Sequence, residues 1–216
     1  MPARPKTSRL AWALTGSGHY LRECLAIAQQ LDNIDLFLSG AAAEVLYMYG
    51  YRLEELRNEM RIYRDQTDCA APVGLFYEGH YHAMVIAPAT SNTVAKCVWG
   101  ISDTLVTNIF AQAGKCQIPS VVFACDTAPE LESEAPNGTV KVYPRQVDLL
   151  NVERLREFEF TQVVSDIPQL RQAIEGMNPC LSASSFRPAS WRKRTCKESC
   201  RRYSRSRSPP RSASWV

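Results

Sequence analysis

Short apolar runs alternate with segments of helical spacing along most of the chain. Four runs, and a fifth within FEFTQVVSD, predict strands: RLAWAL, IDLFLSG, YHAMVIAPA and SVVFACD. Between them, apolar residues recur every three or four positions. This spacing predicts helices over residues 19–31, 41–50, 53–63, 91–115 with a break at Gly100, and 167–177.

A series of strands and helices in alternation favours an α/β fold. We expect a Rossmann-like (flavodoxin-like), mostly parallel sheet with helices on both faces. Ligands of such sheets bind outside the carboxyl ends of the strands. The loops at those ends are small and polar: TGSG (15–18), SGAA (39–42), PATSNT (88–93) and ACDTAPE (124–130). We therefore expect them to line one shared crevice.

Composition divides the chain into three parts. Its 216 residues suffice for one ordinary domain, which we place at 9–179 after an N-terminal extension, 1–8. Residues 180–216 are rich in Ser, Arg and Pro and hold eight Arg, two Lys and one acid, so the tail carries the positive excess and the rest is net acidic. This composition predicts a disordered tail. It suits either an acidic partner or nucleic acid, which we consider unlikely, or a solvated appendage without a specific role.

Several function classes find no support in the sequence. The apolar piece LAWAL is too short for a signal-peptide core, and no run approaches the roughly 18 apolar residues of a membrane span, so we expect a cytoplasmic protein without membrane contact. The eight Cys include no CxxC pair, and the three His form no HExxH motif, so we expect no metal site. No serine stands in a GxSxG elbow.

The loop APATSNTVAK (87–96) has two interpretations. Small hydroxyl and amide residues at the start of a helix can form an N-cap, or they can hold an anion or a polar ring. The turn TGSG is open in the same way: it lacks a complete GxGxxG fingerprint, yet its glycines permit close approach of a phosphate or ring.

A longer pattern matches a known family. The run MVIAPATSNTVAKCVWGISDTLVTN (84–108), with TGSG and SGAA, resembles the homo-oligomeric flavin-containing cysteine decarboxylases over about residues 9–175. That family carries a Pro-Ala-Ser-Ala-Asn-Thr run after a central strand and a later Gly-x-x-Asp-x-Leu-x-Thr segment. The resemblance implies FMN in the crevice and a homo-oligomer built from trimers.

The resemblance also implies which residues contact the cofactor. Ser39 is expected at the phosphate, Gly16 and Ser17 against the ring and ribityl chain, and Lys96 as an added charge. The full set of expected FMN contacts is Thr15, Gly16, Ser17, Gly18, Ser39, Pro88, Ala89, Thr90, Ser91, Asn92, Thr93, Lys96, Ser102, Asp103 and Thr104.

Departures from the family pattern bear on the reaction. The decarboxylases carry a Pro-x-Met-Asn-x-x-Met-Trp clamp where this chain has FACDTAPE, which disfavours cysteine decarboxylation. The forms PATSNTVAK and GISDTLVTN are closer to archaeal-type flavoproteins, including dihydromethanopterin reductases. This narrower resemblance implies an FMN-dependent reductase that reduces a dihydropterin with electrons from NAD(P)H or a ferredoxin-type donor.

Asp126 and His82 are the predicted catalytic residues. A carboxylate at a strand end can accept two hydrogen bonds from the amino and ring N–H groups of a pterin, although Asp126 could equally cap the following turn. His80, His82, Tyr81 or water could deliver a proton. The alternatives to a reductase are a flavin-carrying electron-transfer protein working with a ferredoxin, and a decarboxylase or flavin prenyltransferase of the same fold.

Overall fold

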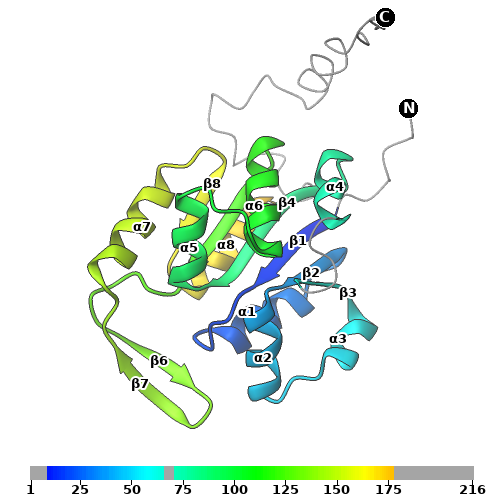
Figure 1. The fold of residues 1–216 in the computed structure, drawn as a ribbon. Helices are drawn as coiled ribbons and strands as arrows, with labels where there is room; N and C mark the ends of the chain where they lie inside the picture. Colours follow the sequence, from blue (N-terminus) through cyan, green and yellow to red (C-terminus); the bar gives the residue numbers. More distant parts are fainter. Residues whose placement is uncertain (1–8, 66–70, 178–216) are drawn as a thin grey trace, which may run out of the picture.

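The computed structural model describes residues 9–65 and 71–177, in which six strands form one parallel sheet (Figure 1). The strand order is β3-β2-β1-β4-β5-β8. The strands are β1 (Arg9–Leu14), β2 (Ile34–Leu38), β3 (Arg61–Arg64), β4 (Tyr81–Ala89), β5 (Ser120–Ala124) and β8 (Thr161–Val164). The chain winds outward from β1 to one side and then from β4 to the other, so β1 and β4 flank the topological switch point. The predicted α/β class is confirmed.

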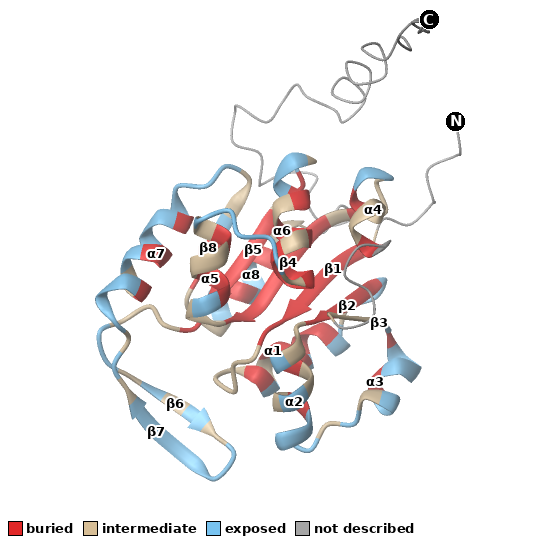
Figure 2. Cartoon of the chain, in the orientation of Figure 1, coloured by how far each residue is buried: buried red, intermediate tan, exposed pale blue. Residues whose placement is uncertain are grey.

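Helices cover both faces of this sheet. They are α1 (Leu21–Gln29), α2 (Gly40–Met48), α3 (Leu53–Glu59), α4 (Ala71–Tyr77), α5 (Ser91–Val98), α6 (Leu105–Lys115), α7 (Gln146–Arg156) and α8 (Ile167–Met177). Buried residues of α1, α2, α3 and α8 pack on one face, and those of α4, α5, α6 and α7 pack on the other. Figure 2 shows the sheet as the buried middle layer.

Successive side chains of a strand point to opposite faces of the sheet, so each central strand contributes residues to the hydrophobic cores on both faces. In β1, Trp12 and Leu14 belong to the core on the α1 side, and Ala11 and Ala13 belong to the core on the α6 side. All four are fully buried. A strand buried on both faces has few polar positions, which explains why β1 is a continuous apolar run.

The sequence prediction missed five elements. Residues 61–63, predicted as the end of a charged helix, instead form most of β3, a short edge strand that pairs with β2. Helices α4 and α7 were not predicted. A separate antiparallel hairpin, β6 (Leu131–Ala135) and β7 (Gly138–Val142), was also missed, because its residues are largely exposed and no buried face gives it a period. Figure 1 shows this hairpin projecting from the body of the domain.

Several predictions concern residues beyond the described ranges. The extension 1–8, the tail 180–216 and Cys69, Cys180, Cys196 and Cys200 all lie outside them. In the described ranges the four cysteines are free thiols, and no three His, Cys, Asp or Glu side chains come together as a metal site. Among the helices described, none has the length and apolar character to cross a membrane.

Candidate functional site

Thr15 joins the carboxyl ends of β1 and β4 at the switch point. Its hydroxyl donates to the carbonyl of Pro88 at 2.8 Å and accepts from the amide of Thr90 at 2.9 Å. Its own amide also donates to Pro88 O. Because Thr15 is buried and its O–H proton is used within the protein, it fixes the distance between the two loops rather than presenting a donor to a ligand.

The turn after β1 lies against the first turn of α2. A Cβ atom added at Gly16 would come 2.6 Å from the Cβ of Ala41, and one added at Gly18 would come 2.1 Å from the Tyr49 hydroxyl. The turn can therefore follow this path only with glycine at position 16, where the neighbour is held by its backbone. The Tyr49 hydroxyl in turn donates to the carbonyl of Glu134, which ties hairpin β6–β7 to this side of the site.

Ser39 begins α2 on the other side of β1. Its hydroxyl accepts from the amide of Ala42 at 3.1 Å, and its amide donates to Leu14 O, the last carbonyl of β1. The amides of Gly40 and Ala41 head the helix, where amides have no intrahelical acceptor. A helix start of this kind suits an anion, because the N–H groups and the helix dipole both favour negative charge.

A second helix, α5, begins at the end of β4. Thr90 caps it by accepting from the amide of Thr93, and the two threonine hydroxyls lie 3.1 Å apart. The Ser91 hydroxyl donates to the carboxylate of Asp126, which follows β5. Asn92 is exposed on the same first turn. The structure thus brings together the PATSNT loop and Asp126, as the sequence analysis expected of neighbouring strand ends.

The expected contacts on the α5–α6 loop are engaged with one another. Lys96 Nζ lies 2.9 Å from both carboxylate oxygens of Asp103, and this pair holds the pKa of Asp103 below its usual range. Thr104 and Thr107 form a capping box at the start of α6, and the amide of Leu105 donates to Asp65. The Lys96 charge is therefore balanced within the loop. Ser102 is exposed beside them.

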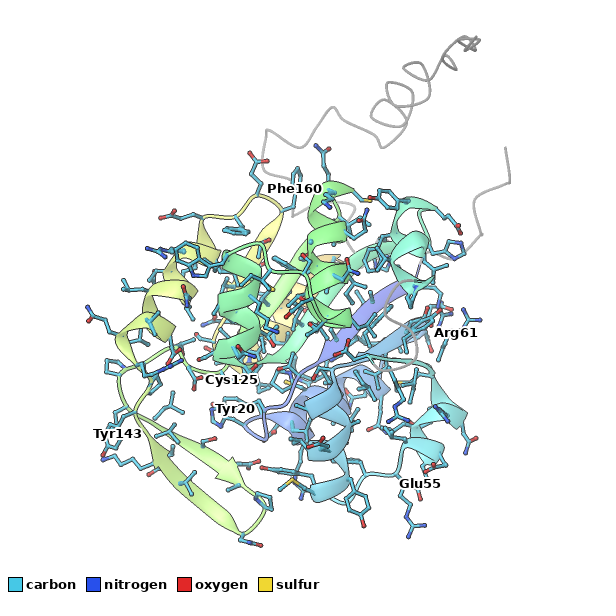
Figure 3. All side chains as sticks on the ribbon, in the orientation of Figure 1. Tyr20, Glu55, Arg61, Cys125, Tyr143 and Phe160 are labelled. Atoms are coloured by element: carbon cyan, nitrogen blue, oxygen red, sulfur yellow. The ribbon has the colours of Figure 1, made fainter. Side chains whose placement is uncertain are left out.

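Cys125 directly follows β5 and contacts the turn after β1. Its thiol donates to the Ser17 hydroxyl at 3.2 Å, and burial raises its pKa to about 12. A thiol with so high a pKa is a poor nucleophile at neutral pH. In Figure 3, Cys125 and Tyr20 lie at the crevice end of the sheet, and Phe160 lies at the other end.

The two predicted catalytic residues are not brought together. His82 is the second residue of β4, seven residues before Ala89, which places it about 23 Å from the crevice end of that strand. Tyr81 and His80 lie at the same remote edge, where Arg9, the first residue of β1, pairs with Tyr81. His80 and His82 do lie at the start of a strand, as the predicted strand 81–89 implied. That start is at the end of the sheet opposite Asp126.

The crevice contains a histidine that the sequence analysis did not select. His19 directly follows TGSG, is half buried, and interacts electrostatically with Asp126 and Glu134. Its adjacency to the glycine turn was visible in the sequence. Its proximity to Asp126 was not, because 107 positions separate the two residues in the chain.

Comparisons with known proteins give the family of this domain. The flavoprotein family model matches residues 2–182. The chain belongs to the flavoprotein family. An uncharacterised Methanocaldococcus jannaschii protein is 36% identical to this flavoprotein over 175 residues, covering 77% of this chain and 94% of the relative.

Two further relatives have functional names. A Methanosarcina mazei dihydromethanopterin reductase (acceptor) is 36% identical over 145 residues, and the match covers 59% of each protein, so this flavoprotein spans about three fifths of that relative. A crystal structure of Burkholderia xenovorans DmrB in complex with FMN, described as a cubic protein cage for redox transfer, has 52% identity and a TM-score of 0.73 over 78% of this chain and 94% of that one. FMN-dependent decarboxylases of known structure at 20% identity or below share the fold.

The groups around the crevice fit a bound flavin nucleotide. Two helix starts, at Ser39 and Thr90, flank the end of β1 and supply neutral hydroxyl and amide donors, which suit a phosphate dianion. Gly16 leaves no room for a side chain, so backbone forms that wall. The carboxylate of Asp126 stands at the start of α5, which makes the start of α2 the better position for a phosphate.

Proposed function

We propose that this protein is an FMN-dependent reductase whose substrate is a 7,8-dihydropterin, dihydromethanopterin being the most direct candidate. The observation that carries the proposal is the arrangement at the carboxyl ends of the strands: glycine backbone after β1, the starts of α2 and α5 on either side of it, and Asp126 held by Ser91 at the start of α5. The 52% identity to an FMN-bound redox protein and the names of the M. mazei and M. jannaschii reductases support the cofactor and the substrate class.

The residues of the crevice divide the binding task. Ser39 and the first amides of α2 would hold the phosphate, Gly16 to Gly18 would lie along the ribityl chain and ring, and Thr90 to Thr93 would bound the ring from the β4 side. Bound FMN would supply the electron pair for reduction. The protein positions the acceptor and shields it from water.

Asp126 is the proposed substrate anchor. It is partly buried and already accepts one hydrogen bond, from Ser91. A carboxylate has about four acceptor positions, so capacity remains for the amino and ring N–H groups of a pterin. The hydrogen bond from the Ser91 hydroxyl fixes the orientation of the carboxylate and so the direction of its remaining acceptor positions.

The partners follow from the same comparison. We propose a homo-oligomer built from trimers, because DmrB is described as a cubic cage. The electrons would come from NAD(P)H or from a ferredoxin-type donor. The sequence has neither a complete dinucleotide fingerprint in the TGSG turn nor a CxxC pair typical of an iron–sulfur site, so it favours neither donor over the other.

Stepwise anaerobic spectroscopy tests this function. The purified protein should bind FMN, accept electrons from a reductant, and return to the oxidised spectrum when dihydromethanopterin is added, with the tetrahydropterin appearing in equal amount. Protein that binds no FMN would contradict the whole proposal.

A flavin-carrying electron-transfer protein is the second candidate, because DmrB is described as serving redox transfer. In that case the reduced flavin would be reoxidised by a ferredoxin but not by any dihydropterin. Decarboxylation is disfavoured by Cys125 and Asp126, which stand where the decarboxylases carry their clamp. Release of carbon dioxide from a cysteine-terminated peptide would reverse that judgement.

A further inference from the structure

His19 is the one histidine at the crevice among the described residues. The chain has three histidines, and His80 and His82 belong to the opposite edge of the sheet. His19 stands in the β1–α1 connection, two residues after Ser17, whose hydroxyl accepts from the Cys125 thiol, and its ring contacts Tyr20 with centroids 4.0 Å apart. Residues of this connection approach the switch point, where ligands of such sheets bind.

Two polar atoms in this turn are buried without a hydrogen-bond partner among the described residues. They are Nδ1 of His19 and Oε2 of Glu23, which lies one helical turn later. A buried polar atom without a partner costs about 1–3 kcal/mol, so native structures keep few of them and usually for a reason. Nδ1 is closed off from solvent, so a hydrogen bond to bound substrate would be made by the other ring nitrogen, Nε2, which is not among the buried unpartnered atoms.

Acidic groups surround the imidazole from three elements. Asp126 after β5, Glu134 on β6 and Glu23 on α1 each favour the imidazolium. Burial opposes them and is the stronger influence, so the pKa of His19 lies below its ordinary value. Arg145 also interacts electrostatically with Asp126 from the start of α7. The imidazole therefore interacts electrostatically with the proposed substrate anchor, Asp126.

We propose that His19 donates the proton that the substrate takes up during reduction, an inference that rests on the proposed function. When the C6=N5 imine of a dihydropterin is reduced, the new C–H bond at C6 needs a hydride, and the bound reduced flavin would supply it by giving up one N–H hydrogen together with the electron pair of that bond. The electron pair of the C=N π bond moves to N5. N5 then takes the proton of the His19 imidazolium, one imidazole N–H bond breaks, and solvent returns a proton to the ring.

Other candidate proton donors of the described chain are less suited. The Tyr81 hydroxyl is committed to Asp35 at the remote edge, and burial raises its pKa far above neutrality. The Cys125 thiol is buried and bonded to Ser17. Asp126 already serves as acceptor for Ser91. Among these groups, His19 is the one whose ring has a nitrogen without a hydrogen-bond partner among the described residues.

The test compares His19→Gln with His80→Gln in the full-length, FMN-loaded protein. Each variant is reduced anaerobically and then mixed with dihydromethanopterin or with ferricyanide, which takes electrons but needs no proton at a substrate nitrogen. We expect His19→Gln to slow reoxidation by dihydromethanopterin about 100-fold and to leave reoxidation by ferricyanide unchanged. His80→Gln should match the wild type with both acceptors.

A second measurement does not depend on turnover. With only three histidines to assign, NMR of selectively labelled histidine follows His19 directly, and the His19→Gln spectrum identifies its signal. Addition of dihydromethanopterin to the protein with oxidised FMN should shift the His19 signal and leave the His80 signal in place. A pH titration followed by the same NMR signal gives the pKa of His19. In the wild type, the rate of reoxidation should fall as the pH rises through that pKa.

The outcomes separate the inference from the function beneath it. If dihydromethanopterin reoxidises wild type and His19→Gln equally fast and with the same pH profile, the His19 role is wrong and the reductase stands. If reduced wild type is not reoxidised by the dihydropterin at all, the reductase and the His19 role fall together. If His19→Gln does not fold or bind FMN, the wild-type comparison decides: a pH profile that does not follow the His19 titration overturns the proposal.

Discussion

The parallel strands begin at one end of the sheet, which we call the amino edge, and finish at the other, the carboxyl edge. Each edge holds one aspartate, and the surroundings of the two aspartates differ. At the amino edge, Asp35 is 1% exposed, with one carboxylate oxygen 2.6 Å from Arg9 Nη2 and the other accepting from the Tyr81 hydroxyl at 2.7 Å. Phe37 and Phe76 pack around this network. Asp35 is therefore enclosed, with both oxygens already engaged by protein donors.

At the carboxyl edge, Asp126 is only partly buried and accepts from a single side chain, that of Ser91. Its surroundings are glycine backbone, two helix starts and an imidazole with an unpartnered nitrogen. The difference teaches that a buried acid or histidine marks a ligand site when its hydrogen-bonding capacity is left over. Where the protein uses that capacity up, as at Asp35, the group stabilises the fold.

The largest effect should come from breaking the amino-edge network. Asp35→Ala leaves the Arg9 charge and the buried Tyr81 hydroxyl without their acceptor, which should lower the free energy of unfolding by about 3 kcal/mol. Asp32→Ala, an exposed aspartate just before β2, should change it little. Urea unfolding measures both. The FMN affinity of the folded fraction should be equal in the two variants, and a loss of affinity in Asp35→Ala would show that the two edges are coupled.

At the carboxyl edge, the close approach at Gly16 should matter next. In Gly16→Ala the new Cβ meets Ala41 at 2.6 Å, so the turn must move away from α2 at a cost of about 1–3 kcal/mol. We expect FMN to bind about 10-fold more weakly or worse, as measured by fluorescence titration. Gly114→Ala, in helix α6 with open space around its Cβ, is the matched control and should keep full affinity. Equal affinities would mean that the turn does not touch the cofactor.

Ser39 should show a smaller and more selective effect. Ser39→Ala removes the cap of α2, worth about 1 kcal/mol, and one hydroxyl near the proposed phosphate position. It should weaken binding of FMN several-fold while hardly changing the affinity for riboflavin, which lacks the phosphate.

Thr104→Ala provides the contrast with Ser39. Thr104 caps α6, whose first amide is already bonded to Asp65, so its loss should affect stability alone. A selective loss of FMN affinity in Thr104→Ala would favour the pocket role that the family resemblance implied for this loop.

The sequence predicted the central strands well because they are buried on both faces. β1, β2, β4 and β5 are mostly apolar, with polar exceptions such as Asp35 and His82, and the loops after them are rich in glycine, proline and small hydroxyl residues. Because β4 and β5 are parallel neighbours, their carboxyl ends lie at the same end of the sheet, and this brings Ser91 close to Asp126. This part of the site was predictable because topology alone brings it together.

Exposed elements and side-chain pairings were not predictable in the same way. β3 and the β6–β7 hairpin bury too little to leave a period in the sequence. His82 was one of several candidate proton donors, but a periodic pattern does not show which end of a strand carries a ligand. Lys96 was expected to add a charge to the cofactor site, and only coordinates show that its two short contacts are both to Asp103.

The last and smallest effect tests whether the carboxyl edge acts as one electrostatic unit. Asp126 is the largest of the three acidic influences that raise the pKa of His19 against burial, followed by Glu134 and then Glu23. Asp126→Asn removes a charge that favours the imidazolium, so the pKa of His19 should fall further below its ordinary value. Glu134→Gln should lower it less, and Glu23→Gln least. Histidine NMR of the pterin-free protein measures all three, with the His80 signal as the internal reference.

Because the imidazolium is the form that donates a proton, any step that requires it should decline at a lower pH in Asp126→Asn than in the wild type. A His19 titration unchanged by Asp126→Asn would mean that the two groups do not sense one another, and the carboxyl edge would then resemble the amino edge, with each polar group serving its own local contact.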